Sequence, residues 1–194
     1  IPKEMLDYPK YGCINVHASL LPKLRGGAPI HKAIIDGYDK TGITIMYMDV
    51  AMDSGDIISQ RETKILDSDT METLHDRLRI MGKELLLSTL PSIFDGSAKR
   101  IKQNADEVTF AYNIKREEEY LDFSKTSREL FNQIRGLNPF PGSSCTICER
   151  EFKVYMARIE KVDTSNARPG EVLHIYKDGI GIATKDYELV LIDI

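Results

Sequence analysis

Strand-like and helix-like segments alternate through the first half of the chain, and this order constrains the fold more than any other feature. Apolar, β-rich runs cover residues 12–17, 42–48 and 56–65. Helical patterns cover residues 28–36 and 69–94, the second with apolar residues at helical spacing. Such alternation favours an α/β domain with a largely parallel sheet. These elements make up about half of a doubly wound sheet, so we expect residues 1–96 to be part of a larger domain.

The second half of the chain shows a different pattern. Helical and strand periodicity is lost between Asp95 and Tyr112, so we expect a linker over residues 97–112. A helix is predicted over residues 127–136. It is followed by strand candidates at 144–148, 152–160, 171–176, 179–184 and 188–194. Short strands at this spacing are typical of a small barrel or sandwich. We therefore expect residues 113–194 to form a separate, oligonucleotide-binding-like β-barrel.

Charge and hydropathy narrow the classes of partner. The net charge is −4, so the chain as a whole does not attract nucleic acid or an anionic membrane. Five basic residues lie in or just after the expected linker, and they are either phosphate contacts or an ordinary solvated surface: Lys99, Arg100, Lys102, Lys115 and Arg116. No stretch approaches the roughly 18 consecutive apolar residues of a membrane-spanning helix, so we expect no membrane partner.

The cysteines are few and predict a reduced environment. Cys13, Cys145 and Cys148 form an odd, sparse set, which is typical of intracellular proteins. The Cys145–Cys148 pair has the spacing of a metal or redox site, but no second pair accompanies it. We interpret the two residues as small apolar members of a strand, and we expect no metal site.

Residues 15–29, NVHASLLPKLRGGAP, carry the residues best suited to chemistry. Asn15 and His17 are two positions apart near the end of a strand, so their side chains share one face of it. An amide and an imidazole together can stabilise an oxyanion and move a proton. The acidic turn 53–56 could bring a carboxylate, such as Asp53, to orient the imidazole. The lack of an evident Ser or Cys nucleophile favours transfer between two bound substrates. A core histidine, a capping asparagine and a simple turn are the alternatives from the residues alone.

A family resemblance favours the catalytic interpretation over these alternatives. The segments NVHASLLP (15–22) and RGGAPI (25–30) resemble the signature of the formyltransferases that use 10-formyltetrahydrofolate. The similarity continues through TGITIMYM (41–48), MDSGD (52–56) and LNPFP (137–141), and it is strongest to the members that act on methionyl-tRNA.

The resemblance implies a function and a site. Asn15, His17 and Asp53 would be the catalytic residues. Ser19, Leu20, Leu21 and Pro22 would line the folate site. The formyl group of the co-substrate 10-formyltetrahydrofolate would pass to the α-amino group of methionyl initiator tRNA, for translation initiation. The barrel would help to hold the tRNA. We expect a monomer in the bacterial cytoplasm or an organellar matrix.

Two other functions are compatible with the sequence. One is another folate-dependent formyltransferase, acting on glycinamide ribonucleotide or a sugar amine. The other is a non-catalytic, tRNA-binding fragment, because the family's catalytic domain begins well before a segment like Ile1-Pro2. We therefore expect the chain to lack the N-terminal part of that domain, which leaves open whether it is active alone.

Overall fold

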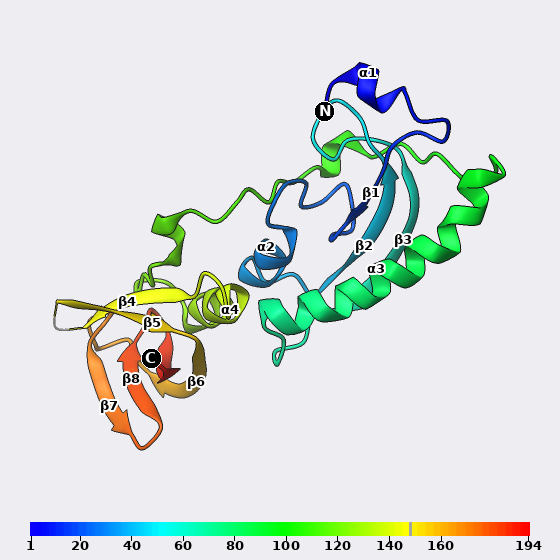
Figure 1. The fold of residues 1–194 in the computed structure, drawn as a ribbon. Helices are drawn as coiled ribbons and strands as arrows, with labels where there is room; N and C mark the ends of the chain where they lie inside the picture. Colours follow the sequence, from blue (N-terminus) through cyan, green and yellow to red (C-terminus); the bar gives the residue numbers. More distant parts are fainter. Residues whose placement is uncertain (148) are drawn as a thin grey trace. The chain divides into compact units, whose positions relative to one another are not determined.

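A computed structural model describes residues 1–147 and 149–194, and the chain in it divides into two compact units (Figure 1). Unit 1 comprises Ile1–Ala33, Tyr38–Asp67 and Thr73–Asn113. Unit 2 comprises Ile34–Gly37, Ser68–Glu72 and Ile114–Ile194. Cys148 lies outside the described residues, and with it half of the predicted Cys145–Cys148 pair. In the described part of the chain, no helix is long and apolar enough to cross a membrane.

The sheet of unit 1 consists of β1 (Ile14–His17), β2 (Lys40–Tyr47) and β3 (Ile57–Lys64), in the order β1-β2-β3. Both pairings are antiparallel, with His17 opposite Thr44 and Thr44 opposite Gln60. Short helices α1 (Lys3–Leu6) and α2 (Pro29–Ile35) precede β2, and the long α3 (Met71–Phe94) follows β3. Helix α1 was not predicted, whereas the other helices and strands of unit 1 lie within a few residues of the predicted positions.

The expected parallel sheet is wrong for the described strands. The chain enters β2 at the end where it left β1, so Ile14 pairs with Tyr47 and His17 with Thr44 in antiparallel register. Residues 18–39 between the two strands would be long enough for a parallel crossover. The alternation of helix and strand in the sequence therefore did not decide the direction of the strands.

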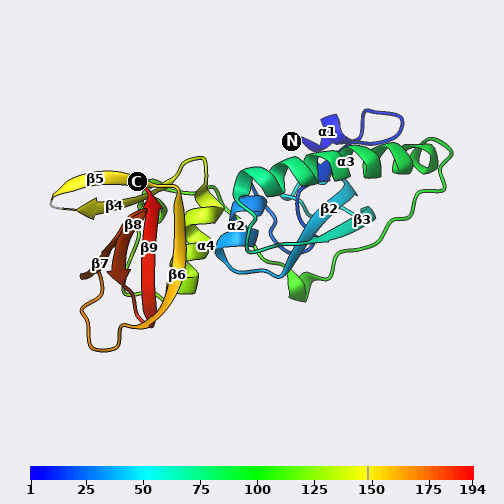
Figure 2. The ribbon, with the colours of Figure 1, turned by 90° about the horizontal axis from the view of Figure 1, so that it is seen from below.

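Helix α3 packs along the sheet through its apolar stripe (Figure 2). Leu74, Leu78 and Leu85, which the helical spacing predicted as core, are buried. Gly82 lies on the same stripe, where a Cβ atom would be 3.2 Å from Val16. The missing side chain lets α3 approach β1 closely, and this packing holds one face of β1 in place.

Residues 97–112, expected as a linker, run along unit 1 in a largely extended conformation, with one short 3-10 helix, Ala105–Glu107. Ile101 exchanges two backbone hydrogen bonds with Ile57 at the start of β3. Further on, Arg25 N–H donates to Thr109 and Ala111 N–H donates to Arg25, at 2.9 and 2.7 Å. The segment is therefore attached to the start of β3 through Ile101 and to the loop of residues 15–29 through Thr109 and Ala111.

The described residues of unit 2 form antiparallel strands, the α-helix α4 (Ser127–Leu137) and a short 3-10 helix, Arg116–Glu119. Strands β4 (Ser143–Ile147) and β5 (Arg150–Val154) form a hairpin. Strands β6 (Met156–Asp163), β9 (Tyr187–Asp193), β8 (Gly179–Ala183) and β7 (Val172–Tyr176) form a four-stranded sheet in that order. One apolar cluster joins the helix to both sheets through Leu130, Cys145 and Leu189. Cys145 is thus a core residue, as expected.

One predicted strand of unit 2 is in fact two. Residues 152–160 were expected to form a single strand, but Tyr155 separates β5 from β6. Phe152 pairs with β4, whereas Arg158 pairs with β9. Residues 154–157 are Val-Tyr-Met-Ala, so no polar or turn residue marks the point at which the chain changes partner.

Candidate functional site

His17 is the last residue of β1, and its ring is fixed by a loop that returns to it. Its Nε2 lies 2.9 Å from the carbonyl oxygen of Leu24. The residue is only 5% exposed. A carbonyl oxygen can only accept, so the hydrogen bond requires the proton to be on Nε2. The other ring nitrogen, Nδ1, is thereby left without a proton in the neutral ring.

Asp53 presents its carboxylate to that nitrogen. It lies in the loop between β2 and β3, and its Oδ2 is 3.7 Å from His17 Nδ1. The same oxygen accepts a hydrogen bond from Gly26 N–H at 2.8 Å. The backbone of Asp53 has φ +49°, in the left-handed region that Asp enters more readily than most residues. The pair can accept a proton on Nδ1 and stabilise the resulting imidazolium.

Asn15 lies beside this pair on the strand. It is two residues before His17, so both side chains are on the same face of β1, while Val16 between them is exposed on the other. Within the described residues, nothing forms a hydrogen bond with the Asn15 side chain. The structure thus brings His17 and Asp53 together and leaves the neighbouring amide available to a ligand.

The loop after β1 is held by side chains from the sheet. Thr44 Oγ1 donates to the Ser19 carbonyl at 2.7 Å and accepts from Leu21 N–H at 3.1 Å. Gln60 Nε2 donates to the Leu21 carbonyl at 2.9 Å. Ser19 and Leu21 are buried, whereas Leu20 and Pro22 are partly exposed. Of the four residues expected to line a folate site, Leu20 and Pro22 therefore have side-chain surface to offer.

The glycine pair that follows allows a close backbone approach. Gly26 has φ +121°, and a Cβ atom there would lie 2.6 Å from the Ala111 carbonyl oxygen. Two backbone hydrogen bonds hold the two segments together here. Ala111 N–H donates to the Arg25 carbonyl, and Ala28 N–H donates to the Ala111 carbonyl. Any larger residue at position 26 would push the Gly26 N–H away from Asp53. The glycine is thus part of what aims the carboxylate.

Sequence reasoning missed the residues that hold the site from a distance. Thr44 and Gln60 lie in predicted strands for which no functional residue was expected, and Gln103 lies in the expected linker. Gln103 Nε2 donates to the carbonyl oxygens of Asp53 and Gly55, both at 2.8 Å. No motif identifies such residues, because their role depends on strand pairing and on a contact 50 residues away in the chain.

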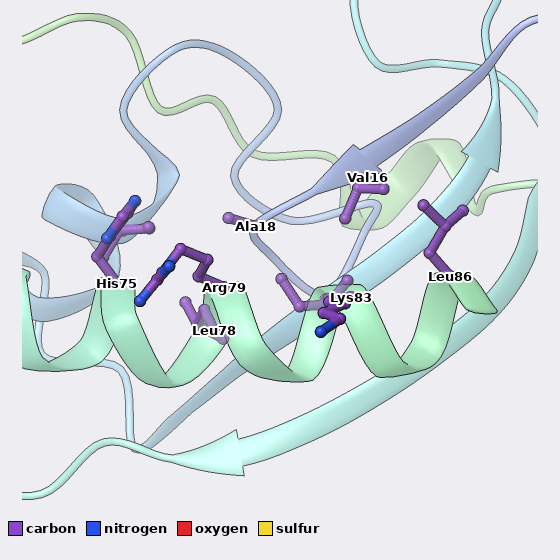
Figure 3. Close-up of a pocket in the computed structure, with 10 residues that line it drawn as sticks. Val16, Ala18, His75, Leu78, Arg79, Lys83 and Leu86 are labelled. Carbon is purple, nitrogen blue, oxygen red and sulfur yellow. The ribbon is translucent and has the colours of Figure 1, made fainter. Parts of the chain in front are cut away.

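Two of the hollows beside the sheet of unit 1 bear on the site. One, of about 280 Å³, adjoins Asp53 and is lined in part by Met46, Met48 and Met52. The other, also about 280 Å³, lies between β1 and α3. Figure 3 shows Val16 and Ala18 on one side of it and His75, Arg79 and Lys83 on α3. The second hollow faces away from His17, so only the first belongs to the site.

Comparison with known families accounts for most of the chain. The sequence pattern described as formyl transferase matches residues 1–90. The pattern described as formyl transferase, C-terminal domain, matches residues 113–194.

Curated relatives are similar over almost the whole chain. A methionyl-tRNA formyltransferase from Bacillus subtilis is 50% identical over 192 residues, which is 99% of this chain and 60% of that protein. Another, from Bacillus cytotoxicus, is 52% identical over 185 residues, which is 95% of this chain and 58% of that protein. The chain therefore spans about 60% of the length of these relatives.

Solved structures share the fold. The N-formyltransferase from Helicobacter canadensis, in complex with folinic acid and dTDP-3-aminofucose, superposes with a TM-score of 0.75 at 22% identity. The match covers 93% of this chain and 66% of that one. A sugar N-formyltransferase candidate from Mycobacterium tuberculosis gives a TM-score of 0.64 at 33% identity, covering 73% of this chain and 63% of that one.

Proposed function

The chain belongs to the formyltransferase family, and we propose that it acts in the transfer of a formyl group from 10-formyltetrahydrofolate to the α-amino group of methionyl initiator tRNA. The observation that carries this proposal is the His17–Asp53 pair, with Nδ1 facing the carboxylate at 3.7 Å and Asn15 beside it. The 50% identity to a methionyl-tRNA formyltransferase over 99% of the chain supports the choice of acceptor.

In the proposed reaction the amine nitrogen attacks the formyl carbon and forms a new C–N bond. The carbonyl oxygen becomes an oxyanion, which the Asn15 amide stabilises by donating a hydrogen bond. Nδ1 of His17 takes the proton that the amine loses, since Nε2 is committed to the Leu24 carbonyl. Asp53 stabilises the imidazolium that forms. The bond from the formyl carbon to N10 of the folate then breaks, and N10 recovers a proton, directly from His17 or through water.

The residues present are compatible with a folate co-substrate near this pair. The hollow beside Asp53 is lined by apolar side chains, including Met48 and Met52, and by the carboxylates of Asp49 and Asp53, so it offers both apolar and polar contacts. The loop bearing Leu20 and Pro22 is rigidly held by Thr44 and Gln60, so a ligand would meet an ordered backbone. We propose that Leu20 and Pro22 contact the co-substrate, while Ser19 and Leu21 act by fixing the loop.

The two halves of the chain have separate roles in this proposal. Residues 1–96 carry the chemistry, residues 97–112 connect, and residues 113–194 bind tRNA as the C-terminal β-barrel domain. The reaction would take place where initiator tRNA is charged, in the bacterial cytoplasm or an organellar matrix, with the protein acting as a monomer.

A direct assay of formyl transfer tests the proposal. The chain would be incubated with 10-formyltetrahydrofolate and either methionyl initiator tRNA or a dTDP-3-amino sugar. We expect formylated methionyl-tRNA and no formylated sugar. Formylation of the sugar alone would identify a sugar amine as the acceptor. A chain that binds tRNA but neither binds folate nor transfers a formyl group would be a non-catalytic fragment. Because the chain spans about 60% of the length of its relatives, a version extended to their full length serves as the second arm. Inactivity of both versions would overturn the proposal.

A further inference from the structure

We infer that Gln103 is a positioning residue that holds the Asp53 loop in place through its side-chain amide. The effect that we expect on turnover rests on the proposed function. The positioning itself rests on geometry and can be measured without a substrate.

The amide of Gln103 joins two loops that are distant in sequence. Its Nε2 donates to the carbonyl oxygens of Asp53 and Gly55, both at 2.8 Å. Its Oε1 accepts from the Arg25 guanidinium, at 3.1 Å from Nε and 2.7 Å from the terminal nitrogen. Both N–H donors of Nε2 thus bind the loop that contains Asp53, and the Oε1 acceptor binds Arg25 in the loop after β1.

The Asp53 loop has a conformation that needs such support. Asp53 is in the left-handed region at φ +49°, which costs free energy for a residue with a side chain. Gly55 passes so close to β2 that a Cβ atom would lie 1.9 Å from the Tyr47 carbonyl oxygen. Gln103 binds the carbonyls on both sides of this tight passage. It therefore fixes the direction in which the Asp53 carboxylate leaves the backbone.

Gln103 is itself held on both sides. Two residues before it, Ile101 exchanges backbone hydrogen bonds with Ile57 at 2.9 and 2.8 Å. Beyond it, Thr109 and Ala111 pair with Arg25. Arg25 therefore contacts the same segment through its side chain at Gln103 and through its backbone at residues 109–111. The backbone is thus fixed to unit 1 on both sides of Gln103, which limits where its side chain can reach.

The inferred role lies outside the matched family patterns. These patterns cover residues 1–90 and 113–194, and Gln103 is between them. Its position follows from the route of residues 97–113 along unit 1.

Three variants separate the contacts of Gln103. Gln103→Met keeps the length of the side chain and removes every hydrogen bond. Gln103→Glu keeps an acceptor for Arg25 but has no donor for the Asp53 and Gly55 carbonyls. The matched control is Gln133→Met, because Gln133 in unit 2 likewise donates to backbone carbonyls, those of Glu118 and Tyr120 at 3.0 Å.

The first readout is hydrogen exchange of the Gly26 amide, followed by NMR at a temperature where all variants are folded. This amide donates to Asp53 Oδ2, so its protection reports whether the carboxylate is in place. We expect both Gln103 variants to exchange about tenfold faster at Gly26 than the parent chain, and Gln133→Met to leave Gly26 unchanged. Parent-like protection at Gly26 in Gln103→Met would overturn the inference. Parent-like protection in Gln103→Glu alone would also overturn it, since the Arg25 contact would then suffice.

The second readout is formyl transfer by whichever version of the protein is active. We expect kcat to fall on the order of 10–100-fold in both Gln103 variants, with KM for the tRNA changed less than twofold. An unchanged kcat in an active enzyme would overturn the role in catalysis. If no version transfers formyl groups, the proposed function fails, and the exchange at Gly26 still decides the positioning role.

Discussion

Each unit contains a histidine close to a carboxylate, and the two pairs are built in opposite ways. In unit 1, His17 Nδ1 lies 3.7 Å from Asp53, with both side chains mostly buried, at 6% and 16% exposed. In unit 2, His174 Nδ1 lies 2.9 Å from Glu188, with the histidine 54% exposed and the carboxylate 0%. The shorter distance belongs to the pair that is not part of the candidate site.

The surroundings explain the difference. The second nitrogen of His17 is fixed by the Leu24 carbonyl, and Asp53 retains access to the ring while accepting from Gly26. Glu188 lies under a strand, where Gly181 leaves room for it and the Tyr176 hydroxyl donates to its other oxygen at 2.8 Å. His174 therefore lies beside a buried carboxylate that the Tyr176 hydroxyl also stabilises, whereas Asp53 lies beside a ring whose other nitrogen is already bound. A short distance between a histidine and a carboxylate alone therefore does not identify the pair proposed for catalysis.

The largest expected effect separates the two histidines by activity. His17→Ala removes the proposed base, so we expect kcat for formyl transfer to fall on the order of 10²–10⁴-fold, with tRNA binding retained. His174→Ala, the matched control, should leave kcat within about twofold, because His174 lies in a unit with no proposed role in proton transfer. Steady-state assays of both variants in an active version of the protein make the comparison. Near-normal turnover of His17→Ala would contradict the mechanism.

An intermediate effect separates two carboxylates by stability. Glu188→Ala leaves the Tyr176 hydroxyl without its acceptor and opens a gap above Gly181, so we expect unit 2 to lose about 1–3 kcal/mol of unfolding free energy. Glu62→Ala in unit 1 removes only an exposed pair with Lys40, which should cost less than about 1 kcal/mol. Urea unfolding followed by NMR signals from each unit measures both. Equal losses for the two variants would show that the burial of Glu188 has no importance.

The smallest effect is the onset of acid sensitivity in unit 2. The Lys153 ammonium keeps the pKa of Glu119 below its ordinary value of 4.5, and hydrogen bonds from Thr126 do the same for Glu129. Burial raises the pKa of Asp186, but donors from the Ser127 and Tyr187 backbones outweigh it, so its pKa is also lowered.

The sign of the pH dependence follows from these directions. In the unfolded chain these carboxyls return to their ordinary pKa values, so below about pH 4.5 the unfolded state binds more protons. The unfolding free energy of unit 2 should therefore be fully present above pH 4.5 and fall as the pH drops further. Urea midpoints at pH 6, 4 and 3 test this, with Lys153→Met as a variant whose decline should be shallower. A midpoint that is constant down to pH 3 would refute the prediction.

Local patterns in the sequence predicted most of the elements and the residues of the candidate site. Helix α3 and helix α4 were recognisable because an apolar stripe at helical spacing is a property of neighbouring residues. The positions of Asn15 and His17 on one strand face follow from the same kind of local rule. The motif around them directed attention to Asp53, although only its type and its place in an acidic turn were visible.

The sequence by itself determined where most helices and strands lie and which side chains are candidates for the proposed chemistry. Only the tertiary structure decided which strand each segment pairs with and what holds the reactive groups. The antiparallel sheet of unit 1, the change of partner at Tyr155 and the contact of Gln103 with Asp53 all join residues far apart in the chain. Such contacts depend on the paths of the loops and on which strand edges and side chains are still free to pair once the other elements have packed. The periodicity of residues within one segment carries no information about either.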